Sequence, residues 1–248
     1  MKIFFVLVLT FSTIVAFDFK HIEVEYRASY GVLGEVGEAT AVLEIEEDRY
    51  KIYVQAQSTG WAKWVTSGRK ERYESRGLIK DGLLLPSLFI KDRIWGEKTE
   101  RKRYAFHHDT EKIHTLLTKV DGIKTEETKN LLSFYAKNDI LSLFFNLPQL
   151  IGKEMQTAKK EFVAVGASRA TGMVTIETPQ GKKKKEIKNL LDRAMPLLVL
   201  TLHQKIFSSR DGAFYLHINS DAICDRLLLK DVLMYGDLLI KAKSIKIK

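Results

Sequence analysis

Cysteine and proline are scarce in this chain, which has 1 cysteine and 4 prolines among 248 residues. Cys224 has no second thiol to pair with, so an intrachain disulfide is excluded, and we expect a buried, unreactive thiol. The sequence also lacks the Gly-x-Ser-x-Gly and His-Glu-x-x-His motifs of hydrolases. Its histidines show no spacing typical of metal ligands. These absences predict a non-enzymatic protein without a metal or cofactor.

The chain opens on a short apolar run. Lys2 precedes apolar residues 3–15, a length typical of a secretory signal peptide and short for a membrane span. We expect cleavage near Ala16, which removes residues 1–16 and leaves one soluble domain, residues 17–248, in the periplasm. An uncleaved anchor or a buried strand is the alternative.

The charge balance is basic. The formal net charge is +9, which favours anionic partners such as phospholipid head groups, lipopolysaccharide or acidic glycans. An exported chain without a nucleic-acid-binding motif is not expected to bind nucleic acid. The run Lys182, Lys183, Lys184 and Lys185 is predicted to lie in an exposed loop between strands. It is either a solvated tip or a contact with an anionic membrane, where each lysine adds about 1 kcal/mol.

The first clear structural signal is a β-hairpin with Glu47 and Asp48 as its turn, so that Glu46 pairs with Arg49. This register places Glu44 opposite Lys51 on one face, and a slip by one residue would bury these charges. The other face is apolar and carries Ala41, Leu43, Ile45, Tyr50, Ile52 and Val54. Similar strands separated by Asp-Gly turns follow, which predicts an all-β fold of further antiparallel strands.

Two stretches after this hairpin carry aromatic and charged residues. Trp61 and Trp64, between Gly60 and Gly68, can share one side of a helical turn. They form either a plug at the end of the sheet or an apolar lip over a ligand groove. Residues 69–79 are charged on both faces and form either an exposed edge strand or the lining of a wet groove.

Proline and capping signals bound the next elements. Pro86 argues against an ordinary central strand at its position. One helix is predicted, with Asn138 or Asp139 as its cap and Pro148 as its end. Its apolar stripe consists of Ile140, Leu143, Phe144 and Leu147, and it needs a packing partner, which we expect to be the concave side of the sheet.

The order of these stretches resembles a known family. The segments YGVLGEVGEATAVLEIEEDRYKIYVQAQSTG, WAKW, RKERYESRGLIKDGLLLPSLF and RKRYAFHHD resemble the domain of unknown function 3108 family of exported bacterial proteins. The resemblance implies a large antiparallel meander curled into a half-open barrel, in the periplasm, without an established activity. The outline is also loosely similar to the periplasmic lipoprotein carriers of the Lol system, which hold acyl chains in a half-open barrel.

The favoured hypothesis is a protein that binds a hydrophobic or lipid-like anionic ligand in a curled sheet and serves in cell-envelope maintenance. Arginine side chains match phosphate and carboxylate geometry, and aromatic rings cover apolar groups. The expected ligand-binding residues are Trp61, Trp64, Arg69, Arg72, Tyr73, Arg93 and Trp95, with Lys91 as a further candidate. The alternative is an envelope module that contacts peptidoglycan or a periplasmic or outer-membrane protein through a sheet edge or basic face.

Overall fold

The computed structural model describes residues 20–151, 159–167, 170–194, 196–203, 213–221, 223–232 and 236–248. Its strands are β1 (His21–Tyr30), β2 (Glu35–Glu46), β3 (Arg49–Ser58), β4 (Lys70–Lys80), β5 (Leu83–Trp95), β6 (Lys98–His107), β7 (Lys112–Asp121), β8 (Lys124–Leu131), β9 (Asn138–Asp139), β10 (Lys159–Val165), β11 (Met173–Glu177), β12 (Leu197–Thr201), β13 (Ala213–Ile218), β14 (Cys224–Val232) and β15 (Gly236–Ile247). Its helices are α1 (Gly60–Val65), α2 (Ile140–Ile151) and α3 (Gly181–Leu191), and η1 (Gly31–Leu33) is a 3-10 turn. The predicted signal peptide lies outside the described residues.

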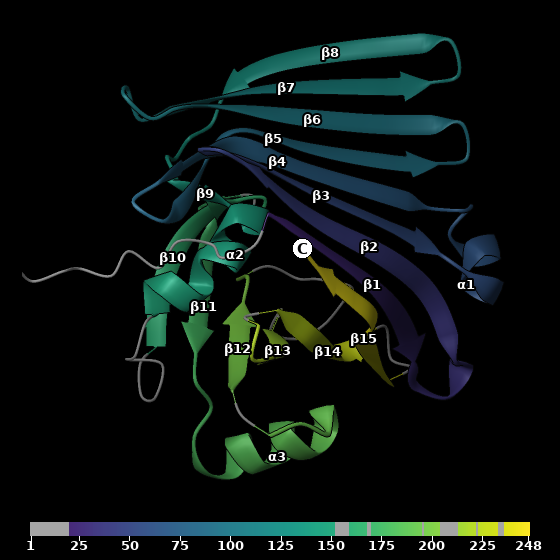
Figure 1. Ribbon diagram of the computed structural model, residues 1–248. Coiled ribbons are helices and arrows are strands. Elements are labelled where there is room, and N and C mark those ends of the chain that lie inside the picture. The colour runs from purple at the N-terminus through teal and green to yellow at the C-terminus, as the bar shows by residue number, and fades with distance from the viewer. Residues whose placement is uncertain are drawn as a thin grey trace, which may run out of the picture.

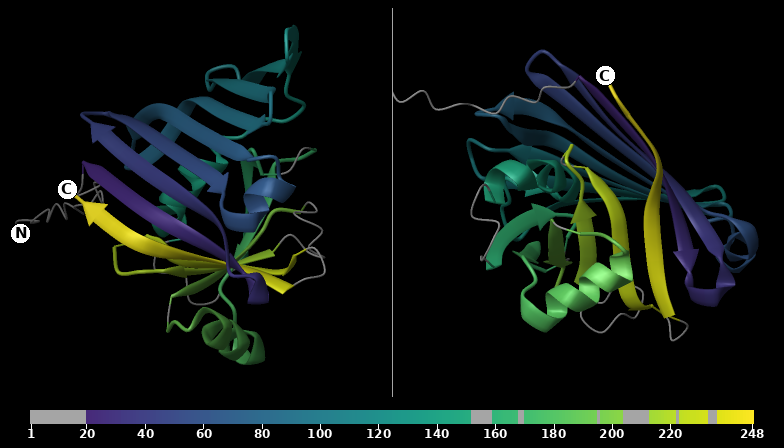
Figure 2. Two further views of the ribbon diagram at one scale, coloured as in Figure 1. Left: turned by 90° about the vertical axis from the view of Figure 1, so that its right-hand side faces the viewer. Right: turned by 60° about the horizontal axis from the view of Figure 1, so that its bottom comes forward.

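All 15 strands belong to one sheet, in the order β8-β7-β6-β5-β4-β3-β2-β1-β15-β14-β13-β12-β11-β10-β9. Neighbours are antiparallel except β9 and β10, which run parallel. Strand β1 lies between β2 and β15, so the two halves of the chain meet at the β1–β15 pair (Figure 2). The sheet curls but does not close, because β8 and β9 remain its edges (Figure 1). The predicted all-β, half-open meander is confirmed.

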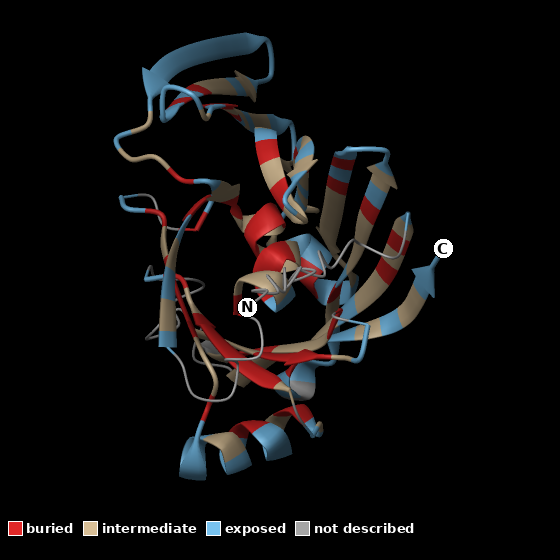
Figure 3. Ribbon diagram, turned by 60° about the vertical axis from the view of Figure 1, so that its left-hand side comes forward, coloured by how far each residue is buried: buried red, intermediate tan, exposed pale blue. Residues whose placement is uncertain are grey.

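Helix α2 fills the middle of the curl (Figure 1, Figure 3). Its Leu143 and Leu147 are buried against β10–β14, while Leu141 and Phe145 pack on the core of β1–β4. We call the face of the sheet that meets α2 the concave face and the opposite one the convex face. The prediction of a helix on the concave side is confirmed, and the apolar centre of the curl is filled by the protein's own side chains.

Polar groups at the start of α2 fix the helix to the sheet. Asp139 Oδ1 accepts hydrogen bonds from the backbone N–H groups of Leu141 and Ser142, at 2.8 and 2.9 Å. The Ser75 hydroxyl on β4 donates to Asp139 Oδ2 at 2.5 Å, and Tyr50 on β3 contacts Ser75 at 2.9 Å. The predicted Asp139 cap is therefore present, and it also joins α2 to strands far away in the sequence.

Asn146 extends this link through the second turn of α2. Its amide accepts a hydrogen bond from the Leu84 N–H and donates one to the Leu84 carbonyl, at 2.8 and 2.9 Å. The side chain thus replaces a neighbouring strand for one residue of β5. The helix does not end at Pro148 as predicted, because Pro148 lies inside it and α2 continues to Ile151.

The structure excludes one of the two alternatives for the charged stretch and contradicts the prediction for Pro86. The charged stretch 69–79 does not form an edge strand, because β4 is paired with β3 and β5 along its length. Pro86 lies within β5, which is also a central strand. Its ring is accommodated by a register shift between Arg76 and Gly77, and Gly77 pairs with Pro86. A bulge and a glycine therefore make room for a proline where the pattern alone predicted a break.

The lysine run was also misassigned. Lys182–Lys185 form the first turn of α3 and not a loop. Ile187 and Leu191 of α3 are buried against β12 and β14, so the helix is fixed to the sheet, while Lys182, Lys183 and Lys185 are exposed. Among the described residues, no helix has the length and apolar character needed to span a bilayer.

Candidate functional site

Strands β4, β5 and β6 place a polar cluster on the concave face, at the end of the strands near α1. Strand register brings Glu71, Arg93 and Glu100 into one cross-strand row, and Tyr73, Lys91 and Lys102 into the next. Residues two apart in a strand share a face, so both rows lie on the side that meets α2. We call these six residues, together with Arg69, the concave cluster. All seven side chains are partly buried.

Glu71 is the centre of the cluster. Arg69 and Tyr73 both donate hydrogen bonds to its carboxylate, and Arg93 approaches it at 3.5 Å. Burial alone would raise the pKa of Glu71, but these hydrogen bonds and the nearby cations hold its pKa below the ordinary value. Glu71 is therefore ionised at neutral pH and serves as the counter-ion of this group.

Two lysines stand directly opposite each other next to this centre. Lys91 on β5 pairs with Lys102 on β6, a like-charged arrangement that is unfavourable on a sheet. Lys91 Nζ lies 5.1 Å from the ring centroid of Tyr73, and Lys102 Nζ lies 5.0 Å from that of Tyr104. Burial lowers the pKa of Lys91. The two aromatic rings offset part of this cost through cation–π contacts.

Arg93 carries a buried atom without a hydrogen bond. Its Nε lies 3.5 Å from Glu71 Oε1 and its Nη1 lies 3.5 Å from Glu100 Oε1, and Nε forms an ion pair but no hydrogen bond. A buried donor without a hydrogen bond is costly and needs a physical explanation. The concave cluster contains 4 cations, namely Arg69, Lys91, Arg93 and Lys102. It contains 2 carboxylates, those of Glu71 and Glu100.

The tryptophans lie at the adjacent end of the sheet. Trp64 on α1 is 87% exposed and Trp61 is 43% exposed, with its indole N–H donating to the Leu33 carbonyl at 3.2 Å. Leu33 is itself 44% exposed. Leu33, Trp61 and Trp64 form an apolar surface that we call the rim patch. The segment after α1 contacts the β5–β6 turn, since the Gly96 N–H donates to the Ser67 carbonyl at 3.1 Å.

The structure brings most of the predicted site residues to one end of the sheet. Arg69, Tyr73 and Arg93 belong to the concave cluster, and Trp95 follows Arg93 on the same face by strand alternation. Arg72 is separated from them, because it pairs with Gln55 and Asp92 on the convex face. The sequence prediction missed Glu71, Glu100 and Lys102. The alternation of Glu71 with Arg69 and Tyr73 could have indicated Glu71, whereas Glu100 and Lys102 lie on β6, where no site residue was predicted.

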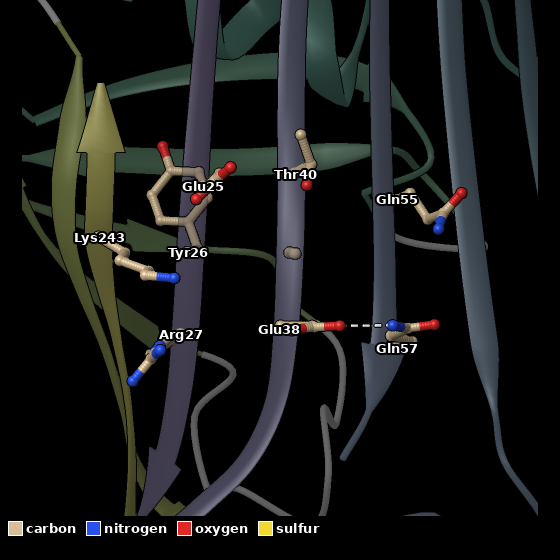
Figure 4. Close-up of a pocket in the computed structure, with 9 residues that line it drawn as sticks. Glu25, Tyr26, Arg27, Glu38, Thr40, Gln55, Gln57 and Lys243 are labelled. Atoms are coloured by element: carbon tan, nitrogen blue, oxygen red, sulfur yellow. Dashed lines mark hydrogen bonds between the residues drawn. The ribbon is translucent and has the colours of Figure 1, made fainter. Parts of the chain in front are cut away.

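Two hollows occur on the convex side of the sheet. One of about 290 Å³ lies across β15, β1, β2 and β3 and is lined mainly by polar side chains (Figure 4). Another of about 510 Å³ lies across β5–β8 and is lined by Leu88, Ala105, Leu116 and Leu131, with Arg103 and Lys129. Neither contains a residue of the predicted ligand-binding set. In the described part of the chain, no group of three or more His, Cys, Asp or Glu side chains could hold a metal ion.

Comparison with known proteins supports the family resemblance. Residues 25–147, from β1 to α2, match the family described as "Protein of unknown function (DUF3108)". A beta-barrel-like protein of domain of unknown function DUF1849 from Brucella abortus has a similar solved structure, with a TM-score of 0.49 and 10% sequence identity. That similarity covers 94% of this chain and 100% of the other. No curated protein matches the chain.

Proposed function

We propose that this chain, a DUF3108-family sequence over residues 25–147, is an exported periplasmic protein that binds an amphipathic anionic ligand without transforming it. The observation that carries the proposal is the concave cluster, where Lys91 and Lys102 face each other beside Arg93. An anion bound between these cations would relieve their repulsion and provide acceptors for the buried guanidinium. A phosphate or carboxylate head group has the required charge and geometry.

The rim patch supplies the apolar half of the proposed site. Trp64 exposes most of its ring, and Trp61 and Leu33 are partly exposed beside it. Exposed apolar surface of this kind is typical of binding sites, and indole rings suit the boundary between water and acyl chains. Because α2 and the core around it fill the middle of the curl, the proposal places the ligand at the α1 end of the concave face.

Ligand binding can be measured with intrinsic fluorescence, since the 3 tryptophans of the chain are all at this end. We expect dodecanoate and a short-chain phosphatidylglycerol to shift the emission, with weaker effects from dodecanol. Replacing Lys91 and Lys102 together by glutamine is expected to weaken dodecanoate binding at least about tenfold, since hydrogen bonds to charged groups contribute about 1.5–3 kcal/mol. Lys51→Gln, an exposed lysine on the convex face, is the matched control.

Two results would contradict the proposal. One is an unchanged spectrum with every amphiphile and no lipid extracted from the purified protein. The other is equal binding by the double variant and the Lys51→Gln control. A protein crosslinked along β8 in intact cells, combined with either result, would instead favour the interaction module. Strand β8 is an edge strand with every residue exposed, which suits strand addition by a partner.

Helix α3 is the proposed membrane contact. Its first turn carries four lysines. The helix dipole favours anions and disfavours cations at this end of the helix. We expect the protein to sediment with vesicles containing 30% phosphatidylglycerol at low salt and to be released at about 0.5 M salt, because screening weakens such contacts. Replacing Lys182, Lys184 and Lys185 by glutamine should lower the bound fraction at least about threefold. An equal fraction for this variant and for Lys51→Gln would remove α3 from the proposal.

A further inference from the structure

The polar hollow on the convex face has an ordered set of side chains. Strand register places Glu25, Thr40 and Gln55 in one cross-strand row of β1, β2 and β3. Arg27, Glu38 and Gln57 form the next row on the same face, and Lys243 of β15 lies at its side (Figure 4). We call this surface the convex groove. It is separated from the concave cluster by the thickness of the sheet.

Two glutamines in the convex groove are oriented in opposite senses. The Tyr53 hydroxyl donates to Gln55 Oε1 at 2.8 Å, which leaves the Gln55 amide NH₂ as a donor. Gln57 Nε2 donates to Glu38 Oε1, so its amide oxygen points away from that carboxylate and remains an acceptor (Figure 4). Neighbouring residues therefore fix one amide as a donor and the other as an acceptor. Less of the binding free energy is then lost in ordering these side chains.

The charges of the convex groove balance. Its lining contains two carboxylates, Glu25 and Glu38, and two cations, Arg27 and Lys243, and Arg27 forms an ion pair with Glu35 at 3.4 Å at the edge of the groove. A surface with equal numbers of both signs does not select an anion or a cation. It does offer donors and acceptors side by side, and adjacent hydroxyl groups of a sugar ring each donate and accept a hydrogen bond.

We propose that the convex groove binds a neutral, hydroxyl-rich ligand, namely a saccharide unit. The volume of about 290 Å³ suits one or two sugar rings rather than a lipid. Gln55 donates to one ring oxygen and Gln57 accepts from a neighbouring hydroxyl, while Thr40 lies beside Gln55 in the first row. This proposal is independent of the proposed lipid ligand, because the two sites share no residue.

The proposal is tested by titrating ¹⁵N-labelled protein with chitotriose and maltotriose while the side-chain amide resonances are followed. We expect saturable shifts at Gln55 and Gln57 with at least one of the two neutral sugars. Gln57→Met and Gln55→Met keep the side-chain length, and each is expected to weaken binding at least about fivefold. Tyr53→Phe, which only releases the Gln55 amide, should weaken it about twofold.

Lys51→Gln on the same convex face is the control, and its affinity should equal that of the unaltered protein. Urea unfolding of each variant establishes that it is folded. The proposal is overturned if neither sugar shifts the two glutamines at 20 mM. It is also overturned if inorganic phosphate shifts them more strongly than the sugars, or if both methionine variants bind as well as the control.

Discussion

Replacing Gly77 with alanine is expected to lower the free energy of unfolding by roughly 3 kcal/mol or more, the upper range for overpacking. A methyl carbon at this position would lie 1.9 Å from the Leu85 carbonyl oxygen and 2.8 Å from Pro86 Cα. Both are backbone atoms of the adjacent strand, so no side chain can move aside. The β4–β5 pairing must open to admit the methyl group, and urea unfolding followed by circular dichroism measures the loss.

Gly122→Ala is the matched control for this prediction. Gly122 has a positive φ of 58° but nothing lies within 4 Å of the added carbon. Its substitution therefore costs only the conformational strain of about 1–2 kcal/mol for a left-handed residue. Equal unfolding midpoints for the two variants would mean that the close approach at Leu85 does not govern the stability of β4 and β5.

Replacing Asp139 with alanine is expected to lower the free energy of unfolding by about 3 kcal/mol. The change removes the acceptor of the Leu141, Ser142 and Ser75 hydrogen bonds and leaves these donors in a buried site. Asp139→Asn keeps one oxygen as the helix cap and an amide that can bond Ser75. It should therefore retain the fold, and thermal unfolding of the two variants at pH 7 provides the comparison.

The same carboxyl group predicts a pH dependence. Burial raises the pKa of Asp139 from its ordinary 3.8 to about 6, although the Ser75 hydrogen bond and those from the start of α2 act in the opposite direction. The folded protein thus binds this proton more tightly than the unfolded chain does. The part of the free energy of unfolding that arises from this pKa difference is full below about pH 4 and is lost as the pH rises through 6, by about 2–3 kcal/mol.

Subtracting the unfolding free energies of Asp139→Asn from those of the unaltered protein isolates this effect from other titrating groups. As the pH rises from 4 to 7, we expect the free energy of unfolding of the asparagine variant to increase relative to that of the unaltered protein. A difference that stays constant over this range would show that Asp139 has the same pKa in both states. The Lys51→Gln variant, whose lysine is exposed on the convex face, should give a flat difference.

The sequence predicted local pairing where side-chain patterns allow one register only. The β2–β3 hairpin was predicted residue by residue, because Glu44 and Lys51 must face water while Leu43 and Ile52 face the core. The Asp139 cap followed from the apolar stripe after it. Family resemblance added the meander, since no local signal shows that strand β1 pairs with β15.

The errors arose where tertiary contacts override a local rule. Pro86 fits a central strand because Gly77 lies opposite it, which depends on two strands at once. Pro148 continues α2, which is held on the sheet by Asn146. Arg72 was wrongly grouped with Arg69. Side chains alternate along a strand, so two residues at an odd spacing lie on opposite faces. Glu71 and Lys102 were missed because their role depends on neighbours in β5 and β6.

The β1–β15 pair has a consequence for the order of folding. Strands β1 to β7 each pair with the next strand in sequence, so this half can assemble as it emerges during synthesis. Strand β1 nevertheless has an open edge until β15, which follows all the other described strands in the sequence, reaches it. Its backbone amides are exposed for that whole interval, which is when unwanted strand addition occurs. A chaperone that acts on this protein during synthesis would be most effective if it covered the open edge of β1.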